Sequence, residues 1–301
     1  MIEDTCTNWL VGGNPESNDG LHTIQGPGLY AGSPDDEWVR LGHNQASVFA
    51  LLRQPGRVLM GADHGLWSWD RMKSGWVQYH DETLTEVLSI AALPGEPGVL
   101  AGCPYGVARA RRDEPGVTRW NFLSEPLSPD ERYTNALLVD PNDPGHWVAG
   151  TEAGIILYTQ DGAQTTRGDL FDSPVRALFY TQDRFWAGTD DRGIFSSQDG
   201  LHWVAAGEGV EGAVYAIASA GTKLVAATPY GLVVGDGAGP WQRCGPRMLF
   251  VTVAVDPADP TRWMAGASPG GLWHTQDAGQ SWRQIDTYKH VRAVLAPEGQ
   301  D

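Results

Sequence analysis

The sequence has little positive charge, few cysteines and no long apolar run. Only three of its 301 residues are lysine, and the formal net charge at pH 7 is −16. Because affinity for nucleic acids comes mainly from Lys and Arg side chains that neutralise phosphates, this balance argues strongly against a nucleic-acid-binding protein. No stretch reaches the ~18 consecutive apolar residues that a membrane helix needs. We therefore expect no membrane span.

The cysteines and the N-terminus bear on the compartment. Cys6, Cys103 and Cys244 are widely spaced and form no CxxC pair, which favours a reducing environment and no disulfide framework. The first residues, Met1 to Asp4, are acidic and do not resemble a signal peptide. A cytoplasmic location is therefore expected, with a secreted or periplasmic one if a leader has been removed.

Turn-forming and aromatic residues are abundant instead. The chain has 38 Gly, 20 Pro and 13 Trp, and 41% of its residues are hydrophobic, which is enough to form a core. Helical periodicity is absent, and short apolar runs are separated by turn residues about every 8–12 positions. These features predict an all-β protein.

An internal repeat predicts the architecture. Residues 138–167 and 254–283 share an apolar pair, Ala-Gly, three or four further residues, Gly and a second apolar pair. Equivalent positions recur about every 40 residues, at Gly61, Gly102, Gly150, Gly188, Ala227 and Gly266. Four short strands repeated at this period are typical of β-propeller blades. The Ala-Gly pairs are expected where neighbouring backbones approach closely.

The repeat and the two chain ends together predict seven four-stranded blades in one domain, residues 1–301. The expected blades are 48–80, 87–123, 135–170, 175–207, 214–245, 251–286, and 291–298 with 8–42. The last of these is shared between the N- and C-termini, which closes the ring and leaves no open sheet edge. The stretch 14–26 is an insertion without an assigned role, and a different interpretation of it would give six or eight blades.

A motif recurs in the turn between the third and fourth strands. Thr275–Trp282 has Ser/Thr-x-Asp-x-Gly-x-Ser/Thr-Trp, Ser197–Trp203 is one residue shorter, and Thr159–Gly162 keeps the turn without the Trp. In such a turn the Asp accepts backbone hydrogen bonds, Gly takes a positive φ and Trp packs on the blade. The residues assigned this structural role are Asp161, Asp199, Asp277, Trp203 and Trp282.

With these motifs in register, the chain resembles the Asp-box (BNR) repeat propellers over nearly its whole length. That group includes sialidases, xyloglucanases, sortilin-type receptors and photosystem II assembly-factor-like proteins. The resemblance implies a fold and not a function, because in this group the motif lies on the face opposite the usual ligand site.

Candidate ligand residues are expected in two kinds of loop, which share one face of a propeller. One kind joins the second and third strands of a blade, and the other joins one blade to the next. Together with two positions on inner strands, the candidates are Arg176, Arg292, Arg192, Arg247, Arg132, Tyr105, Tyr133, Tyr230, Glu152, Asp190 and Asp191.

Two arginines hold a shared position on inner strands. Arg176 and Arg292 stand where the other blades have Phe49, Leu88, Ala136, Tyr215 and Thr252. An arginine there can bind a carboxylate or phosphate through two hydrogen bonds. The favoured interpretation for both arginines is a salt bridge between blades with Asp172, Glu208 or Glu211.

Two further groups suggest chemistry. Asp190, Asp191, Glu152, Tyr133 and Tyr230 have the side chains needed for general acid, base and nucleophile in glycosyl transfer. The loop residues with metal-ligand side chains are His43, His64, His80, His290, Asp63 and Asp81. They suggest a zinc or other transition-metal site. No short ligand spacing supports that site, so solvated loop histidines are the favoured interpretation and no cofactor is predicted.

The sequence thus leaves three functions open. The favoured one is a non-catalytic propeller that binds a protein or peptide and serves as an interaction or assembly scaffold. The first alternative is a glycoside hydrolase or lyase acting on an acidic glycan. The second is a propeller that binds a metal or another small ligand.

Overall fold

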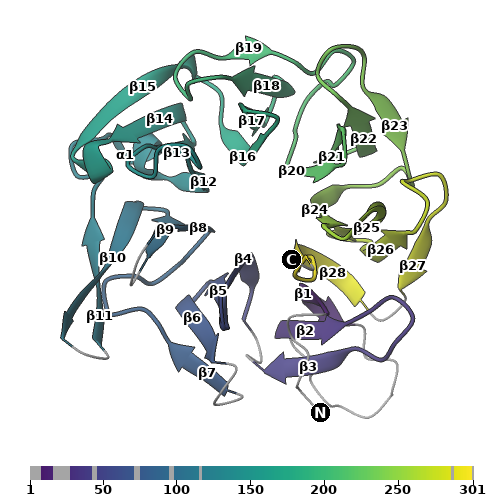
Figure 1. The fold of residues 1–301 in the computed structure, drawn as a ribbon, viewed down its shortest axis with the longest axis horizontal. Helices are drawn as coiled ribbons and strands as arrows, with labels where there is room; N and C mark the ends of the chain where they lie inside the picture. Colours follow the sequence, from purple (N-terminus) through teal and green to yellow (C-terminus); the bar gives the residue numbers. More distant parts are fainter. Residues whose placement is uncertain are drawn as a thin grey trace. The chain divides into compact units, whose positions relative to one another are not determined.

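The computed structural model describes residues 8–15, 28–42, 46–70, 75–94, 98–114, 117–285 and 288–299. Within these ranges the strands β1–β28 form seven four-stranded antiparallel sheets (Figure 1), and the α-helix α1 (Pro129–Arg132) is four residues long. The protein is an all-β, seven-bladed β-propeller, as the repeat predicts. None of the helices among the described residues has the length and apolar character needed to cross a membrane.

Two compact units divide the chain, and the first contains three sheets. It comprises residues 1–49, 208–210 and 215–301. The first sheet is β28 (Tyr288–Leu295), β1 (Trp9–Pro15), β2 (Gly28–Gly32) and β3 (Val39–Gly42). The second is β20 (Ala216–Ala220), β21 (Lys223–Thr228), β22 (Gly231–Gly235) and β23 (Gln242–Cys244). The third is β24 (Phe250–Asp256), β25 (Asp259–Ala267), β26 (Gly271–Thr275) and β27 (Arg283–Ile285).

The second unit, residues 50–207 and 211–214, contains the other four sheets apart from the first residues of β4. One sheet is β4 (Val48–Gln54), β5 (Arg57–Ala62), β6 (Gly65–Asp70) and β7 (Gly75–Gln78). The next is β8 (Ser89–Ala92), β9 (Val99–Cys103), β10 (Gly106–Glu114) and β11 (Val117–Phe122). Then come β12 (Thr134–Val139), β13 (Trp147–Thr151), β14 (Gly154–Thr159) and β15 (Gln164–Phe171). The last is β16 (Val175–Thr181), β17 (Arg184–Thr189), β18 (Ile194–Ser197) and β19 (Val204–Ala205).

The first and last strands of the chain lie side by side in one sheet. β28 pairs antiparallel with β1, with Leu10 opposite Leu295 and Val11 opposite Val294 (Figure 1). The blade shared between the termini is therefore present, as predicted. Most of the predicted insertion, residues 16–26, lies outside the described residues. The expectation of a single domain stays a prediction.

Glycines on the second strands let the backbones of neighbouring sheets approach closely, as the Ala-Gly pairs in the sequence predict. A Cβ on Gly61 would lie 2.8 Å from the carbonyl oxygen of Val87, and one on Gly188 would lie 2.6 Å from that of Val214. Each of these valines precedes the inner strand of the following sheet. Because a side chain would force these backbones apart, glycine is required by packing at both positions.

Two of the three motif turns form the expected hydrogen bonds. Asp199 Oδ1 accepts from the backbone N–H groups of Leu201 and His202 at 2.9 and 2.8 Å. Asp277 Oδ1 accepts from the backbone N–H of Ser281 at 2.8 Å. The Nε1–H groups of Trp203 and Trp282 donate to the carbonyl oxygens of the turn glycines, at 3.0 and 3.1 Å.

The third turn differs. Asp161 has φ 58° in a short 3-10 turn, and its carboxylate lies 3.7 Å from the guanidinium of Arg109. The indole of Trp147 lies 2.7 Å from where a Cβ on Gly162 would be, so it covers this turn from the second strand of the sheet. That contact accounts for a turn that lacks the later tryptophan.

Among the described residues, four inner strands contain a β-bulge at the same place. The register skips one residue between Thr134 and Ala136 in β12, and between Val175 and Ala177 in β16. It also skips one between Phe250 and Thr252 in β24, and β28 has the same shift opposite Gly12 and Gly13. The bulged residues are Asn135, Arg176, Val251 and Arg292. The sequence alignment that equated Arg176 with Ala136 and Thr252 is therefore wrong by one residue, because a bulge adds a residue that the repeat does not reveal.

A glycine substitution tests the close approach of neighbouring sheets. We expect Gly188→Ala to destabilise the protein by about 1–3 kcal/mol, because the new Cβ meets a backbone oxygen that cannot rotate away. Gly239→Ala is the matched control, since a Cβ there has no atom within 4 Å. Urea unfolding midpoints of the two variants measure the difference. Equal midpoints would show that the contact does not limit packing.

Candidate functional site

Short turns after the second strands present several of the candidate residues. Thr151 and Thr228 each donate their hydroxyl to the carbonyl oxygen of the glycine three residues later, at 2.8 Å. Thr189 donates to the carbonyl oxygen of Gly193 at 2.9 Å. The residues between the donor and the glycine form the tip of each turn. These hydrogen bonds are not among the predictions above, although their Thr-x-x-Gly spacing is visible in the sequence at Thr151–Gly154 and Thr228–Gly231.

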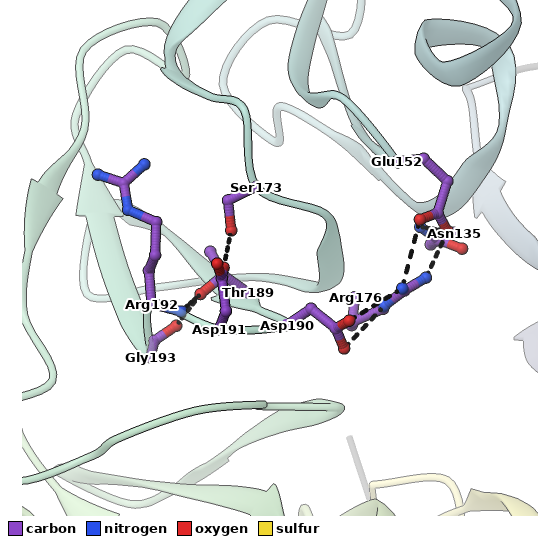
Figure 2. A network of polar contacts seen from close by, with 9 residues as sticks. All are labelled: Asn135, Glu152, Ser173, Arg176, Thr189, Asp190, Asp191, Arg192 and Gly193. Carbon is purple, nitrogen blue, oxygen red and sulfur yellow. Dashed lines mark hydrogen bonds and ion pairs between the residues drawn. The ribbon is translucent and has the colours of Figure 1, made fainter.

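The main polar cluster of the second unit, the Arg176 cluster, consists of Asn135, Glu152, Arg176 and Asp190 (Figure 2). Arg176 Nη1 and Nη2 donate to the two carboxylate oxygens of Glu152, at 2.5 and 3.3 Å. Its Nε and Nη2 donate to the two oxygens of Asp190, both at 3.2 Å. Asn135 Nδ2 adds a bond of 3.2 Å to Glu152. One guanidinium therefore binds two carboxylates.

This arrangement links two sheets, because Glu152 follows β13 whereas Arg176 is on β16. The favoured expectation of a salt bridge is confirmed for Arg176, but with other partners, and it is wrong for Arg292, which forms no ion pair with the described residues. Glu152 and Asp190 take the place of the expected Asp172, Glu208 and Glu211. The bulge in β16 brings Arg176 to the turns at Glu152 and Asp190. The repeat predicts both turns but does not reveal the bulge.

Burial and nearby charges shift the pKa values of Arg176 and of Tyr133. Desolvation opposes the charge of Arg176, but its hydrogen bonds to Asp190 and Glu152 outweigh that effect and raise the pKa of the guanidinium. Tyr133 interacts electrostatically with two members of the same cluster, Glu152 and Arg176. Burial raises the pKa of Tyr133, and the carboxylates of Glu86 and Glu152 raise it further, so it stays protonated at neutral pH.

Asp191 and Arg192 belong to the same turn as Asp190 but make separate contacts. Ser173 donates its hydroxyl to Asp191 Oδ1. Figure 2 shows Arg192 extending away from Arg176. Its guanidinium lies 5.0 Å from the centre of the Phe195 ring, and its Nη1 donates to the carbonyl oxygen of Phe171 at 3.4 Å.

Charged residues in the loop before β12 form hydrogen bonds and an ion pair that stabilise the loop. Arg132 Nε donates to the carbonyl oxygen of Leu127 at 2.7 Å, and Nη2 donates to that of Glu125. Glu131 is buried, pairs with Arg167 and accepts from the hydroxyl of Ser128 at 2.6 Å. The hydrogen bond from Arg167 lowers the pKa of Glu131 to about 2. Arg132, a predicted ligand residue, therefore binds its own loop.

Of the remaining candidates, Tyr105 forms a hydrogen bond within the protein, whereas Tyr230 and Arg247 are exposed. The hydroxyl oxygen of Tyr105 accepts from the backbone N–H of Thr85 at 2.7 Å. Tyr230 holds the equivalent turn position, yet it is 65% exposed. Arg247 is also exposed.

The histidines do not form a metal site among the described residues. His64 pairs with Asp63 at 2.8 Å, and His80 contacts the carbonyl oxygen of Leu66 at 2.8 Å. Asp81 accepts from the backbone N–H of Trp120, on the neighbouring sheet, at 3.1 Å. The described ranges contain no group of three or more His, Cys, Asp or Glu side chains that could hold a metal ion. His43 lies outside these ranges, so the metal site stays a prediction.

A pocket of about 230 Å³ lies in the first unit. Its lining comes from β1, β28 and the residues that begin β4. These are Gly12, Gly13, Asn14, Ser47, Val48, His290 and Arg292. His290 Nδ1 lies 3.2 Å from the hydroxyl oxygen of Ser268. Two predicted candidates, Arg292 and His290, therefore share one pocket.

Replacing Arg176 tests the energetics of the cluster. We expect Arg176→Gln to destabilise the protein by about 1–3 kcal/mol, because Glu152 and Asp190 lose their shared positive partner. Arg184→Gln in the same sheet is the control, since Arg184 makes one bond to a neutral hydroxyl, of Ser196 at 3.2 Å. Urea unfolding measures both, and an equal loss in the two variants would contradict this account.

The lowered pKa of Glu131 predicts that its contribution to folding stability depends on pH. Because its folded pKa lies below its unfolded value of about 4.3, its stabilisation is complete above that value and is lost as the pH falls toward 2. We expect Glu131→Gln to cost on the order of 2 kcal/mol at pH 7 and progressively less below pH 4. Thermal unfolding between pH 2 and pH 7 measures this, with the exposed Glu125→Gln as control. A cost that does not change with pH would contradict the assignment.

Comparisons with known proteins come from structure alone. No protein-family model and no curated protein match the sequence. A computationally designed protein, Ika8, matches with 15% identity and a TM-score of 0.59, over 87% of this chain and 85% of that one. The extracellular domain of BT4673 from B. thetaiotaomicron matches with 15% identity and a TM-score of 0.67, over 88% of this chain and 36% of that one.

The GH74 enzyme of Niastella koreensis matches with 17% identity and a TM-score of 0.62, over 79% of this chain and 45% of that one. The chain thus spans less than half the length of either natural protein. At these identities the likeness to all three is one of fold alone.

Proposed function

We propose that this protein is a non-catalytic propeller that serves as an interaction or assembly scaffold, and that its turns and loops bind a protein or peptide. One observation carries the proposal: the carboxylates that would do catalysis already have partners. Both oxygens of Glu152 and both oxygens of Asp190 accept hydrogen bonds from Arg176. Asp191 accepts from Ser173. Side chains used in this way build a rigid surface.

We also assign the chain to the Asp-box propellers. The support is the hydrogen bonding of two turns, in which the Ser197 and Thr275 hydroxyls bind Asp199 and Asp277 at 3.0 and 2.7 Å. The same carboxylates cap the following backbone, and a tryptophan closes each turn. A short motif can arise by chance, but two turns with the same bonds at equivalent places in two sheets support a common origin of the repeat.

The alternative is a carbohydrate-active enzyme, a glycoside hydrolase or lyase. It is favoured by the likeness to a protein titled a GH74 enzyme and by Tyr133, which lies within electrostatic reach of Glu152. Two features oppose it. The raised pKa of Tyr133 makes it a poor nucleophile, and Glu152 has both oxygens on Arg176 rather than free to accept a proton.

A glycosidase also needs a carboxylic acid that remains protonated near its working pH. Among the described residues, every carboxyl group whose pKa is shifted has a lowered pKa, as at Glu131 and Asp277, where it is about 2. The cause in each case includes hydrogen bonds to the charged form. These groups favour the ionised state and not the acid that leaving-group protonation requires.

The scaffold proposal predicts which substitutions affect binding. Tyr230→Ala combined with Arg247→Ala removes an exposed aromatic side chain and an exposed arginine, both typical of binding surfaces. We expect this double variant to lose at least about tenfold in affinity for the partner captured from cells of the source, because each anchor typically contributes 1 kcal/mol or more. Surface plasmon resonance against the purified partner measures the loss.

The control for this experiment is Val204→Ser, which changes a side chain that is 60% exposed on the outer strand β19. We expect it to bind as the unchanged protein does. Equal binding by all three forms would place the interaction elsewhere and contradict the proposal. Release of reducing ends from acidic polysaccharides, lost in Glu152→Gln, would establish the enzyme alternative instead.

A further inference from the structure

The bulged arginine occurs twice, in β16 and in β28, and the strand registers allow the two surroundings to be compared residue by residue. In β16 Arg176 lies between Val175 and Ala177, which pair with Thr189 and Gly188. In β28 Arg292 lies between Val291 and Ala293, which pair with Gly13 and Gly12. The residue after Gly13, Asn14, is thus the equivalent of Asp190.

The second neighbour follows in the same way from the preceding sheet. Before Arg176 that sheet is β12–β15, where Thr134 pairs with Thr151 and Glu152 comes next. Before Arg292 it is β24–β27, where Phe250 pairs with Ala267 and Ser268 comes next. Ser268 therefore occupies the place of Glu152. The two carboxylates that neutralise Arg176 are replaced at Arg292 by an amide and a hydroxyl.

The guanidinium of Arg292 is left with its charge unpaired by the described residues. Within these ranges its side chain forms no ion pair or hydrogen bond, and it is exposed along the wall of the 230 Å³ pocket. Asn14 and His290 line the same pocket, and Ser268 contacts His290. The chain has a net charge of −16. Arg292 is nevertheless a positively charged side chain that no described carboxylate of its own sheet neutralises.

We propose that Arg292 binds the carboxylate of a small ligand in this pocket, with Asn14 and His290 as polar neighbours. The contact between Arg176 and Glu152 is the internal example: Nη1 and Nη2 each donate to one oxygen of the carboxylate. The ligand's carboxylate takes the position that the Glu152 side chain has at Arg176. Paired N–H donors of arginine match a carboxylate in geometry as well as in charge.

The dimensions of the pocket restrict the ligand. Pockets that enclose drug-sized molecules have volumes of about 300–1,000 Å³, so 230 Å³ suits a short carboxylate or the acidic end of a longer molecule. The site goes beyond the scaffold function because it needs no protein partner. Its failure in a direct titration would leave the scaffold proposal standing.

Isothermal titration of the full chain with succinate tests the site, with succinamide as the uncharged comparison. We expect succinate alone to bind, and Arg292→Gln to weaken it by about tenfold or more, because a charge-assisted bond is lost. Arg243→Gln, which removes the same charge from the outer strand β23, is expected to leave the affinity unchanged. No binding by the unchanged protein, or equal losses in both variants, would overturn the proposal.

A second variant keeps Arg292 and introduces a carboxylate beside it. Asn14→Asp supplies the carboxylate that Asp190 provides at Arg176, so we expect succinate binding to fall about tenfold or more while the melting temperature is maintained. Retained binding would overturn the proposal. Phosphate serves as the competing anion, and a phosphate affinity equal to that of succinate would overturn the assignment to a carboxylate.

The same titration distinguishes the source of the carboxylate. Succinate represents a free small acid, and an N-acetylated Gly-Gly-Asp peptide represents an acidic chain end. The tighter of the two identifies the source, and in either case the binding must be lost in Arg292→Gln. A peptide that binds equally well to Arg292→Gln would show that its contact lies elsewhere and would contradict a role for the pocket.

Discussion

The contact between a glycine on one sheet's second strand and a valine before or at the start of the next sheet's inner strand determines much of the local architecture. It recurs at Gly61 with Val87, Gly150 with Val175, Gly188 with Val214 and Gly266 with Val291, with closest approaches of 2.5 to 2.7 Å from an added Cβ. Because this contact brings the backbones together, the residue after the valine lies beside the turn of the preceding sheet. In β16 and β28 that residue is bulged and is an arginine.

Arg176 and Arg292 occupy the same backbone position, and the side chains of the neighbouring turns determine the role of each. At Arg176 they provide Glu152 and Asp190, and the result is a closed ion-pair cluster that joins two sheets. At Arg292 the equivalent turn positions hold Ser268 and Asn14, of which Asn14 lines a pocket together with Arg292. The same repeat thus produces a structural arginine in one place and a candidate ligand arginine in another. Such substitution within turns is how propellers vary function on a constant fold.

The sequence predicts the fold well because the repeat is itself the fold signal. The positions of Gly61 and Gly188, the shared terminal blade and the turns at Asp199 and Asp277 all follow from residue types at a fixed period. The site is harder to predict. A bulge changes the side-chain register without changing composition, so Asn135 and Val251 were missed as equivalents of Arg176. Arg132 and Asp81, both in connecting segments, bind backbone groups, which no pattern in the sequence indicates.

The central claim is that Arg292 is an open carboxylate site whereas Arg176 is a closed one. Crystals of the protein soaked in 4-bromobenzoate, whose aryl bromide does not alkylate side chains, test it most directly, because the anomalous signal of bromine locates the bound acid. The account predicts a bromine peak in the pocket beside Asn14 and Arg292, and none beside Glu152 and Arg176. An empty Arg292 pocket, or equal peaks at both arginines, would contradict it.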